Sequence, residues 1–220
     1  EIKTENSENS VVIKAHFAIV AAVVQKIMDI YAEWVINAKG EIRVKIHALK
    51  DMELPFMPRF GVRLFLNEKY KNVCYFGKGP DESYIDKQQA SYYDEFYTTV
   101  NDMVEDYIRP QENGTKTDIR WWKMLNQSGS GIKIVAEAPF SASALHYTIE
   151  SLDEGLDKQQ GHSQEVEEAD LTNLCIDKVQ AGLGCEDSWG RIARPEYLVP
   201  YADYEFTFIL SPVRHSIGIE

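Results

Sequence analysis

The side chains best suited to acid–base chemistry in this sequence are histidines and carboxylates. His146 and His162 are candidates to pair with a glutamate and open a sugar ring, because imidazole titrates near neutral pH. Retaining hydrolysis of a glycosidic bond would instead need two carboxyl groups about 5–5.5 Å apart. Glu186 and Asp187 are adjacent, so on an extended backbone they point to opposite sides and cannot form that pair. Any distant pair among the 35 acidic residues could, and the sequence does not choose between them.

A glycine-rich loop contains an aromatic residue that is a candidate to bind a ligand. Gly182 and Gly184 allow close turns, and Trp189 follows between Ser188 and Gly190. A tryptophan in this setting is either presented to a ligand or buried in the core. Its spacing in the sequence leaves both interpretations open.

Two further loops are unusual in composition. Residues 75–87 contain Gly-x-Gly-Pro after a predicted strand, but no helix beginning with Lys-Ser or Lys-Thr follows, so a phosphate-binding loop is excluded. Residues 107–122 mix polar side chains with aromatic rings, a combination that hydrogen-bonds hydroxyl groups and stacks on the C–H face of a sugar. A buried polar network would explain this second segment equally well.

Loops of this kind need a rigid scaffold, and the sequence predicts one made of β-strands. Apolar residues occupy every second position from Met28 to Ile36, and again from Ile42 to Ala48. This period of two is typical of strands with one buried face. Residues 37–40 supply turn chemistry, so we predict a β-hairpin. We also favour a strand over a helix for residues 16–25, because they are rich in β-branched side chains.

The rest of the chain alternates short predicted strands with long loops. Residues 77–122 are expected to be mostly loop, 141–156 at most briefly helical, and 159–170 a solvated acidic excursion. The fold class predicted from these patterns is all-β, sandwich-like, with mostly antiparallel strands and long loops. The further predicted strands are 61–66, 73–76, 132–138, 171–179 and 204–210.

Composition excludes several classes of function. The 220 residues include 23 Lys and Arg against 35 Asp and Glu, a net charge of −12, which argues against binding nucleic acid or an anionic membrane. No apolar stretch is long enough to span a bilayer. Cys74, Cys175 and Cys185 are widely spaced and odd in number, so we expect buried, inert thiols. The histidines show no metal-ligand spacing.

Separated segments, in a fixed order, carry a resemblance to a known family. The segments are Pro58-Arg59-Phe60-Gly61, Tyr75-Phe76-Gly77 through Tyr84-Ile85-Asp86-Lys87, Arg109-Pro110-Gln111-Glu112-Asn113-Gly114 with Asp118-Ile119-Arg120-Trp121, residues 177–189, Pro195-Glu196-Tyr197 and Tyr204-Glu205-Phe206. With these segments the chain resembles the C-terminal domain of glycoside hydrolase family 2 β-galactosidases, called the small chain in two-subunit forms.

The resemblance implies a fold, a parent enzyme and a set of partners. The fold would be a galactose-mutarotase-like β-supersandwich. In that family the catalytic glutamates lie on a separate TIM barrel, which is not encoded here. The resemblance therefore implies no catalytic residue, no metal ligand and no cofactor in this chain. Its partners would be a galactoside substrate and the other domains of the parent enzyme, and any divalent or monovalent cations would lie in the absent barrel.

The resemblance also implies a sugar-binding residue. The family's domain contributes to the active site the tryptophan of a Gly-Gly-Asp-Asp-Ser-Trp loop, which stacks on the sugar. The matching loop here is Gly184-Cys185-Glu186-Asp187-Ser188-Trp189, in which a cysteine and a glutamate replace the second glycine and the first aspartate. Trp189 is thus implied to bind substrate, with loop support from Gly184, Asp187 and Ser188.

The domain boundaries follow from the same comparison. We expect residues 1–10 to be disordered or a linker, and residues 11–220 to be a β-galactosidase C-terminal domain that is truncated at its N-terminus. The family's upstream Trp-Arg-Ala-Pro-Thr-Asp-Asn-Asp segment is not found before Val11. Strand edges left open by a truncation would favour association, so a homo-oligomer is among the expected partners.

The leading hypothesis is a non-catalytic domain that supports the barrel of a β-galactosidase and adds a sugar-stacking tryptophan to its active site. The alternatives are a stand-alone carbohydrate-binding module and an aldose-epimerase-like protein on the same fold. The sequence leaves the compartment undecided between bacterial cytoplasm and periplasm.

Overall fold

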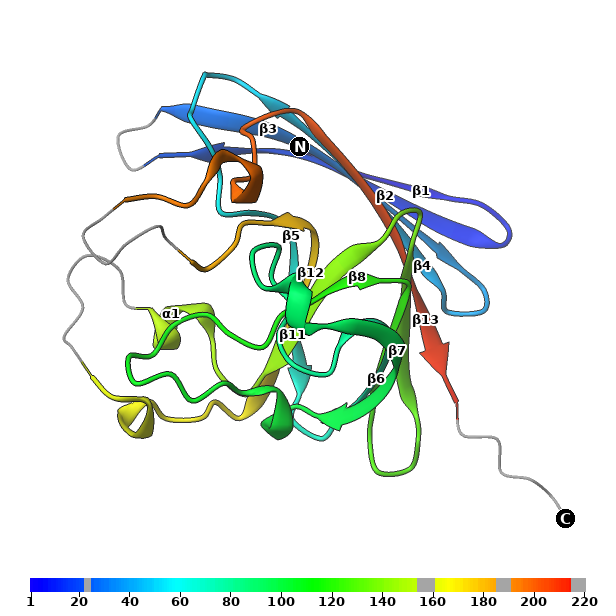
Figure 1. The fold of residues 1–220 in the computed structure, drawn as a ribbon. Helices are drawn as coiled ribbons and strands as arrows, with labels where there is room; N and C mark the ends of the chain where they lie inside the picture. Colours follow the sequence, from blue (N-terminus) through cyan, green and yellow to red (C-terminus); the bar gives the residue numbers. More distant parts are fainter. Residues whose placement is uncertain (22–24, 154–160, 185–190, 215–220) are drawn as a thin grey trace, which may run out of the picture.

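The computed structural model describes residues 1–21, 25–153, 161–184 and 191–214, and these form two antiparallel sheets (Figure 1). The all-β class with antiparallel strands is therefore confirmed. Within the described residues, no helix has the length and apolar character needed to cross a membrane. The nine-stranded sheet contains, in spatial order, β1 (Ile2–Asn6), β2 (Ser10–Val20), β3 (Lys26–Asn37), β4 (Ile42–Lys50), β13 (Tyr204–Val213), β10 (Gly131–Ala136), β9 (Trp121–Leu125), β6 (Asn72–Gly79) and β7 (Tyr92–Thr99). The four-stranded sheet contains β5 (Arg59–Asn67), β12 (Leu171–Gln180), β11 (Phe140–Leu145) and β8 (Lys116–Ile119).

The predicted hairpin is confirmed as β3 and β4. Met28, Ile30 and Ala32 are buried along one face of β3, as the period-two pattern requires. In the turn, the Asn37 side-chain oxygen accepts hydrogen bonds from the backbone N–H groups of Lys39 at 2.9 Å and Glu41 at 3.1 Å. The turn geometry is thus held by the asparagine side chain, which is a common role for this residue.

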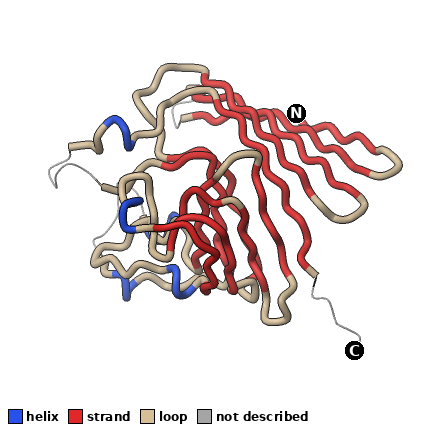
Figure 2. Tube along the Cα trace, turned by 45° about the vertical axis from the view of Figure 1, so that its right-hand side comes forward, coloured by secondary structure: helices blue, strands red, loops and turns tan. Residues whose placement is uncertain are grey.

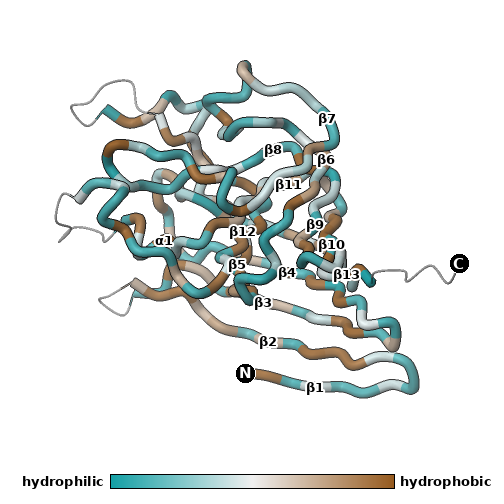
Figure 3. The backbone as a smooth tube through the Cα atoms, turned by 90° about the horizontal axis from the view of Figure 1, so that it is seen from below, coloured by the Kyte–Doolittle hydropathy of each residue, from teal (hydrophilic) through white to brown (hydrophobic). Residues whose placement is uncertain are grey.

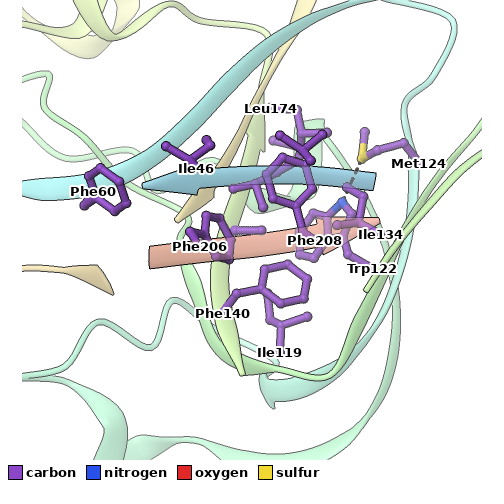
Figure 4. Packing of buried hydrophobic residues seen from close by; sticks show 14 of the residues in the cluster. Ile46, Phe60, Ile119, Trp122, Met124, Ile134, Phe140, Leu174, Phe206 and Phe208 are labelled. Atoms are coloured by element: carbon purple, nitrogen blue, oxygen red, sulfur yellow. Dashed lines mark hydrogen bonds between the residues drawn. The ribbon is translucent and has the colours of Figure 1, made fainter. Parts of the chain in front are cut away.

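The core lies between the two sheets. Phe208 of β13 and Trp122 of β9 are buried from the larger sheet, and Phe140 of β11 and Leu174 of β12 from the smaller one (Figure 4). The Trp122 indole N–H donates to the Met124 sulfur at 3.0 Å, so its one polar group is satisfied inside the core. Alternating residues of both sheets fill this space, which is the usual packing of a β-sandwich.

Two segments differ from the prediction. Residues 141–156 were expected to be at most briefly helical; the short helix α1 (Ile149–Leu152) agrees with this, but β11 covers the start of the segment. All six residues of β11 are buried, and its small side chains alternate only between Phe or Ala and Ser, a weak signal for a strand. The expected loop 77–122 contains β7, β8 and the start of β9. Strand β7 is mostly exposed, which again hides its period of two.

The N-terminal residues also differ from the prediction. Residues 1–10 were expected to be disordered or a linker, but β1 lies within them and pairs antiparallel with β2 from Ile2↔Ala15 to Asn6↔Val11. Every residue of β1 is exposed, so no apolar pattern marks it. Figures 2 and 3 show the hairpin of β1 and β2 at the margin of the molecule, beyond the four-stranded sheet.

Short 3₁₀ turns interrupt the loops. They are η1 (Gln88–Ala90), η2 (Asn101–Met103), η4 (Ser163–Glu165) and η5 (Pro195–Tyr197).

Candidate functional site

Three loops meet at one end of the sandwich, which we call the loop end. They are residues 80–91 between β6 and β7, residues 100–115 between β7 and β8, and the described part of the segment after β12, residues 181–184 and 191–203. The Ser83 N–H donates to the Thr115 carbonyl at 2.8 Å and joins the first two loops. The Gly182 N–H donates to the Tyr197 carbonyl at 3.2 Å and closes the third.

Asp86 holds the glycine turn that leads toward residue 189. Its Oδ2 accepts a hydrogen bond from the Gly184 N–H at 2.6 Å. The turn lies so close that a Cβ atom on Gly182 would sit 2.4 Å from the Asp86 Cγ atom, and one on Gly184 would sit 2.8 Å from Oδ2. A side chain at either position would therefore displace the Asp86 carboxylate from the turn. A charge-assisted bond of this kind fixes the start of the loop to the β6–β7 loop.

A buried carboxylate joins the first two loops. Glu82 Oε2 accepts from the Gly114 N–H at 3.0 Å, while Oε1 accepts from the Tyr107 hydroxyl and from the Lys87 amine. The Lys87 amine also donates to the Tyr107 hydroxyl at 2.7 Å. Glu82 is 5 % exposed, and its partners satisfy both oxygens of this buried carboxyl group.

Arg59 of β5 pairs with Asp177 of the neighbouring strand β12. Its guanidinium forms two hydrogen bonds with the Asp177 carboxylate, one of them at 3.2 Å from Nε. A third N–H donates to Glu112 at 2.8 Å, and Gln180 donates to the same carboxylate. Planar, bidentate pairing is the geometry that arginine forms best with a carboxylate.

The electrostatics of the loop end follow from burial and pairing. Burial would lower the pKa of the Lys87 amine, but its hydrogen bonds to Glu82 and Tyr107 outweigh burial and raise the pKa above its usual value. For Lys116, burial dominates and lowers the pKa to about 8, although Glu105 and Glu82 oppose the change. Burial likewise raises the pKa of the Cys175 thiol to about 11, so this thiol is inert at neutral pH.

The predicted site residues are placed only in part. Gly184 is described, and its backbone N–H donates a hydrogen bond to Asp86 at the loop end. Trp189, Asp187 and Ser188 lie outside the described residues, as does Glu186.

The structure places both histidines that the sequence singled out. His146 is buried, and its Nδ1 lies 2.9 Å from the Leu171 carbonyl oxygen and 3.5 Å from the Thr172 hydroxyl. His162 is exposed, and its backbone N–H donates to Glu165 at 2.7 Å. Among the contacts of the described residues, neither imidazole is hydrogen-bonded to a glutamate carboxylate.

Sequence reasoning missed the residues that organise the loop end. Glu82, Asp86, Glu112 and Asp177 all lie within segments that carry the family resemblance, yet none was singled out as a site residue. The available signal was a concentration of charged residues within loops that also contain glycine and proline. In the portion of the chain that the structure describes, no group of three or more His, Cys, Asp or Glu has the arrangement of a metal site.

Comparison with protein families decides where the chain belongs. The family model described as the β-galactosidase small chain matches residues 1–210. The chain belongs to this family. The match covers the segments that meet at the loop end and also β1, so it extends over residues that sequence analysis had set apart from the domain.

Individual relatives of this small-chain domain are much longer than the chain. It is 33 % identical to a β-galactosidase of Actinobacillus pleuropneumoniae over 210 residues, which are 96 % of this chain and 20 % of that protein. It is 34 % identical to a β-galactosidase of Staphylococcus xylosus over 177 residues, 80 % of this chain and 17 % of that protein. The chain thus spans about a fifth of the length of these curated relatives.

Solved structures give a partial likeness. The galactose 1-epimerase from Lactobacillus acidophilus NCFM matches 97 % of this chain and 66 % of its own at a TM-score of 0.46 and 7 % identity. A putative aldose 1-epimerase from Escherichia coli K12 matches 97 % of this chain and 68 % of its own at a TM-score of 0.40 and 9 % identity.

Proposed function

We propose that this chain is the C-terminal domain of a retaining β-galactosidase, that it supports the TIM barrel, and that it presents Trp189 to the galactoside. It contributes no catalytic carboxylate in this proposal. The observation that carries the proposal is the family match over residues 1–210, which includes every loop that meets at the loop end.

The geometry of the glycine turn supports this role. Asp86 accepts a hydrogen bond from the N–H of Gly184, which precedes Trp189 in the same segment of the sequence. A substrate-stacking ring needs such a fixed base, because a ring held in place loses less conformational freedom when a ligand binds. Stacking on the apolar face of a galactoside is worth on the order of 1–3 kcal/mol.

The direct test is Trp189→Ala in the full-length parent enzyme. We expect KM for a β-galactoside to rise at least about fivefold, because each 1.4 kcal/mol of lost binding is tenfold in the binding constant. Trp189→Phe keeps an aromatic face and should recover part of the loss. Steady-state kinetics with a chromogenic galactoside measures both.

The matched control removes another exposed aromatic ring from the same domain. Tyr31 lies on the outer face of β3 and is 45 % exposed. Tyr31→Ala should leave KM unchanged. An unchanged KM in Trp189→Ala, with the fold intact by circular dichroism, would overturn the proposed stacking.

The non-catalytic part of the proposal has its own test. Glu82→Gln and Glu112→Gln remove charge from carboxylates of the loop end while keeping their shape. Because the chemistry is assigned to the barrel, kcat should remain within about tenfold of the parent value. A loss of about 10²–10⁴-fold, the usual contribution of a general acid or base, in a variant that is still folded would place catalytic chemistry in this domain.

A further inference from the structure

A polar cavity lies at the end of the sandwich opposite the loop end. Its volume is about 660 Å³, within the range of roughly 300–1,000 Å³ that is typical of small-molecule sites. Lys71 and Asp170 of its lining directly precede β6 and β12, and both strands end at the loop end. Because β6 has eight residues and β12 has ten, the cavity and the loop end are roughly 25–35 Å apart.

Of the described residues that line this cavity, His146 is the buried one, at 8 % exposed. Its Nδ1 lies 2.9 Å from the Leu171 carbonyl oxygen, which can only accept, so the neutral ring carries its proton on Nδ1. The same nitrogen lies 3.5 Å from the Thr172 hydroxyl. Nε2 is then an acceptor, and no described residue donates a hydrogen bond to it. A ligand that donates a proton to Nε2 would satisfy this buried group.

The backbone on both sides of the cavity is held by hydrogen bonds. The Ala169 N–H donates to the His146 carbonyl at 2.7 Å, and the Leu171 N–H donates to the Ala169 carbonyl at 2.6 Å. In the β9–β10 turn, the Asn126 side-chain oxygen accepts from the Ser128 N–H at 2.9 Å and from the Ser128 hydroxyl at 2.7 Å. A ligand would therefore meet segments that are already ordered, which lowers the entropy lost on binding.

Exposed polar side chains of several kinds surround the buried imidazole. They are Glu68, Lys69, Lys71, Asn101, Gln127 and Asp170. Within the described part of the chain, none of the four charged residues in this group forms an ion pair. Amines donate, carboxylates accept and carboxamides do both, so this rim offers donors and acceptors around one buried acceptor.

We propose that this cavity binds a neutral saccharide of one or two rings, with one sugar hydroxyl donating to Nε2 of His146. Each sugar hydroxyl both donates and accepts, which matches the mixed rim. An anion would instead face the carboxylates of Glu68, Glu168 and Asp170. No three His, Cys, Asp or Glu side chains of the described residues are arranged to hold a metal ion. The inference does not depend on the role proposed for Trp189.

Hydrogen exchange in the full-length enzyme, followed by peptide mass spectrometry, tests binding at this cavity. The probes are galactose, maltose and thiodigalactoside, each titrated to about 0.1 M. We expect at least one of them to slow exchange of residues 126–130 and 168–171 about tenfold, and to leave the turn at residues 38–40 unchanged. If none of the three slows these segments, the proposal is overturned. Stronger slowing by free lysine or by inorganic phosphate would also overturn it, because the ligand would then be charged.

Two variants of His146 separate its two nitrogens. His146→Asn keeps an N–H for the Leu171 carbonyl and removes Nε2, whereas His146→Gln places an amide group near the position of Nε2. We expect the saccharide effect to be lost in His146→Asn and partly kept in His146→Gln. In both variants kcat and KM for a chromogenic galactoside should match the parent, which shows that they are folded. An undiminished effect in His146→Asn would overturn the proposal.

Trp189→Ala distinguishes this inference from the proposed stacking. The saccharide effect at residues 126–130 and 168–171 should be unchanged in that variant, whatever happens to KM. Loss of the effect in Trp189→Ala would overturn the proposal, because the slowing would then depend on a ligand bound at residue 189.

A pair of acidic residues provides a second test that leaves His146 intact. Asp170 lines the cavity, whereas Glu167 is exposed and lies outside its lining. Asp170→Ala should raise the saccharide concentration that gives half of the effect about threefold to tenfold, the equivalent of about one net hydrogen bond. Glu167→Ala should leave it unchanged. Equal effects of the two substitutions would contradict a saccharide in this cavity.

Discussion

At the centre of the sandwich, Phe208 and Trp122 are buried among apolar neighbours, whereas at the loop end Glu82 and Asp177 are buried among charged partners. The free energy gained by burying apolar side chains is roughly proportional to the buried area, and such a core tolerates exchange between side chains of similar volume. Buried charge depends on a particular partner in a particular geometry, because an unpaired ion in the interior is costly. Packing at the centre therefore stabilises the fold, while the paired charges at the loop end hold a few backbone segments in position.

The largest effect is expected from a cavity at the centre. Phe208→Ala should lower the free energy of unfolding by about 3–5 kcal/mol, because the space left by the ring is only partly refilled. Native-state hydrogen exchange of the β4 and β13 amides in the full-length enzyme measures the change. Phe65→Ala is the control, since this ring is 55 % exposed and its removal should cost far less. A larger change in KM than in stability for Phe208→Ala would contradict the comparison.

The next effect comes from breaking a buried ion pair. Arg59→Met leaves the Asp177 carboxylate, whose side chain is 3 % exposed, without its main partner. We expect a loss of about 3 kcal/mol by denaturant unfolding. Arg63→Met is a matched control on the same strand, because Arg63 pairs at 2.8 Å with Glu150, whose side chain is 67 % exposed. That variant should lose less than about 1 kcal/mol. Equal losses would show that burial does not distinguish the two pairs.

The pH dependence of stability tests the same comparison at a buried lysine, Lys116. The Lys116 amine has a pKa of about 8 in the folded protein, against an ordinary lysine pKa of 10.5, so the unfolded chain binds more protons between these values. Stability should therefore rise as pH increases from about 8 to 10.5, by up to about 3 kcal/mol. In Lys116→Met this rise should be missing, whereas in Lys39→Met, at an exposed turn, it should remain. Parallel pH profiles for wild type and Lys116→Met would refute the assignment.

The smallest effect is expected at the glycine turn. Asp86→Ala removes the acceptor for the Gly184 N–H and should raise KM for a galactoside about threefold to tenfold, the equivalent of about one net hydrogen bond. Asp86→Asn keeps an acceptor oxygen and should lie between Asp86→Ala and wild type. The unfolding free energy should fall by no more than about 1–2 kcal/mol in either variant. A stability loss with no change in KM would make Asp86 a purely structural residue.

The sequence predicted β3 from its alternating pattern and missed β1, which has no buried face. Met28, Ile30 and Ala32 are buried and alternate with less buried residues, so β3 was evident. Strand β1 is exposed throughout, so no apolar alternation marks it. Periodicity reports a difference between two faces, and it gives no signal in a strand whose residues are all exposed.

The candidate site could be predicted only as a set of segments. The family resemblance named the loops that meet at the loop end, but pairing between residues such as Arg59 and Asp177 depends on strands 118 positions apart. No local pattern encodes such a contact. Asp86 could not be separated from its acidic neighbours until the fold placed Gly182 and Gly184 against it.

The position of β13 in the sheet has a consequence for biosynthesis. This strand follows every other described strand along the chain, yet it lies between β4 and β10 and pairs Tyr204 with Ala48 and Gly131 with Val213. On the ribosome, β1–β4 can form one set of local ladders and β6, β7, β9 and β10 another, but the two sets remain separate half-sheets until residues 204–213 are available. A nascent chain that ends before Tyr204 would thus leave the edges of β4 and β10 unpaired, whereas both are paired with β13 in the folded domain. Unpaired strand edges of this kind promote aggregation.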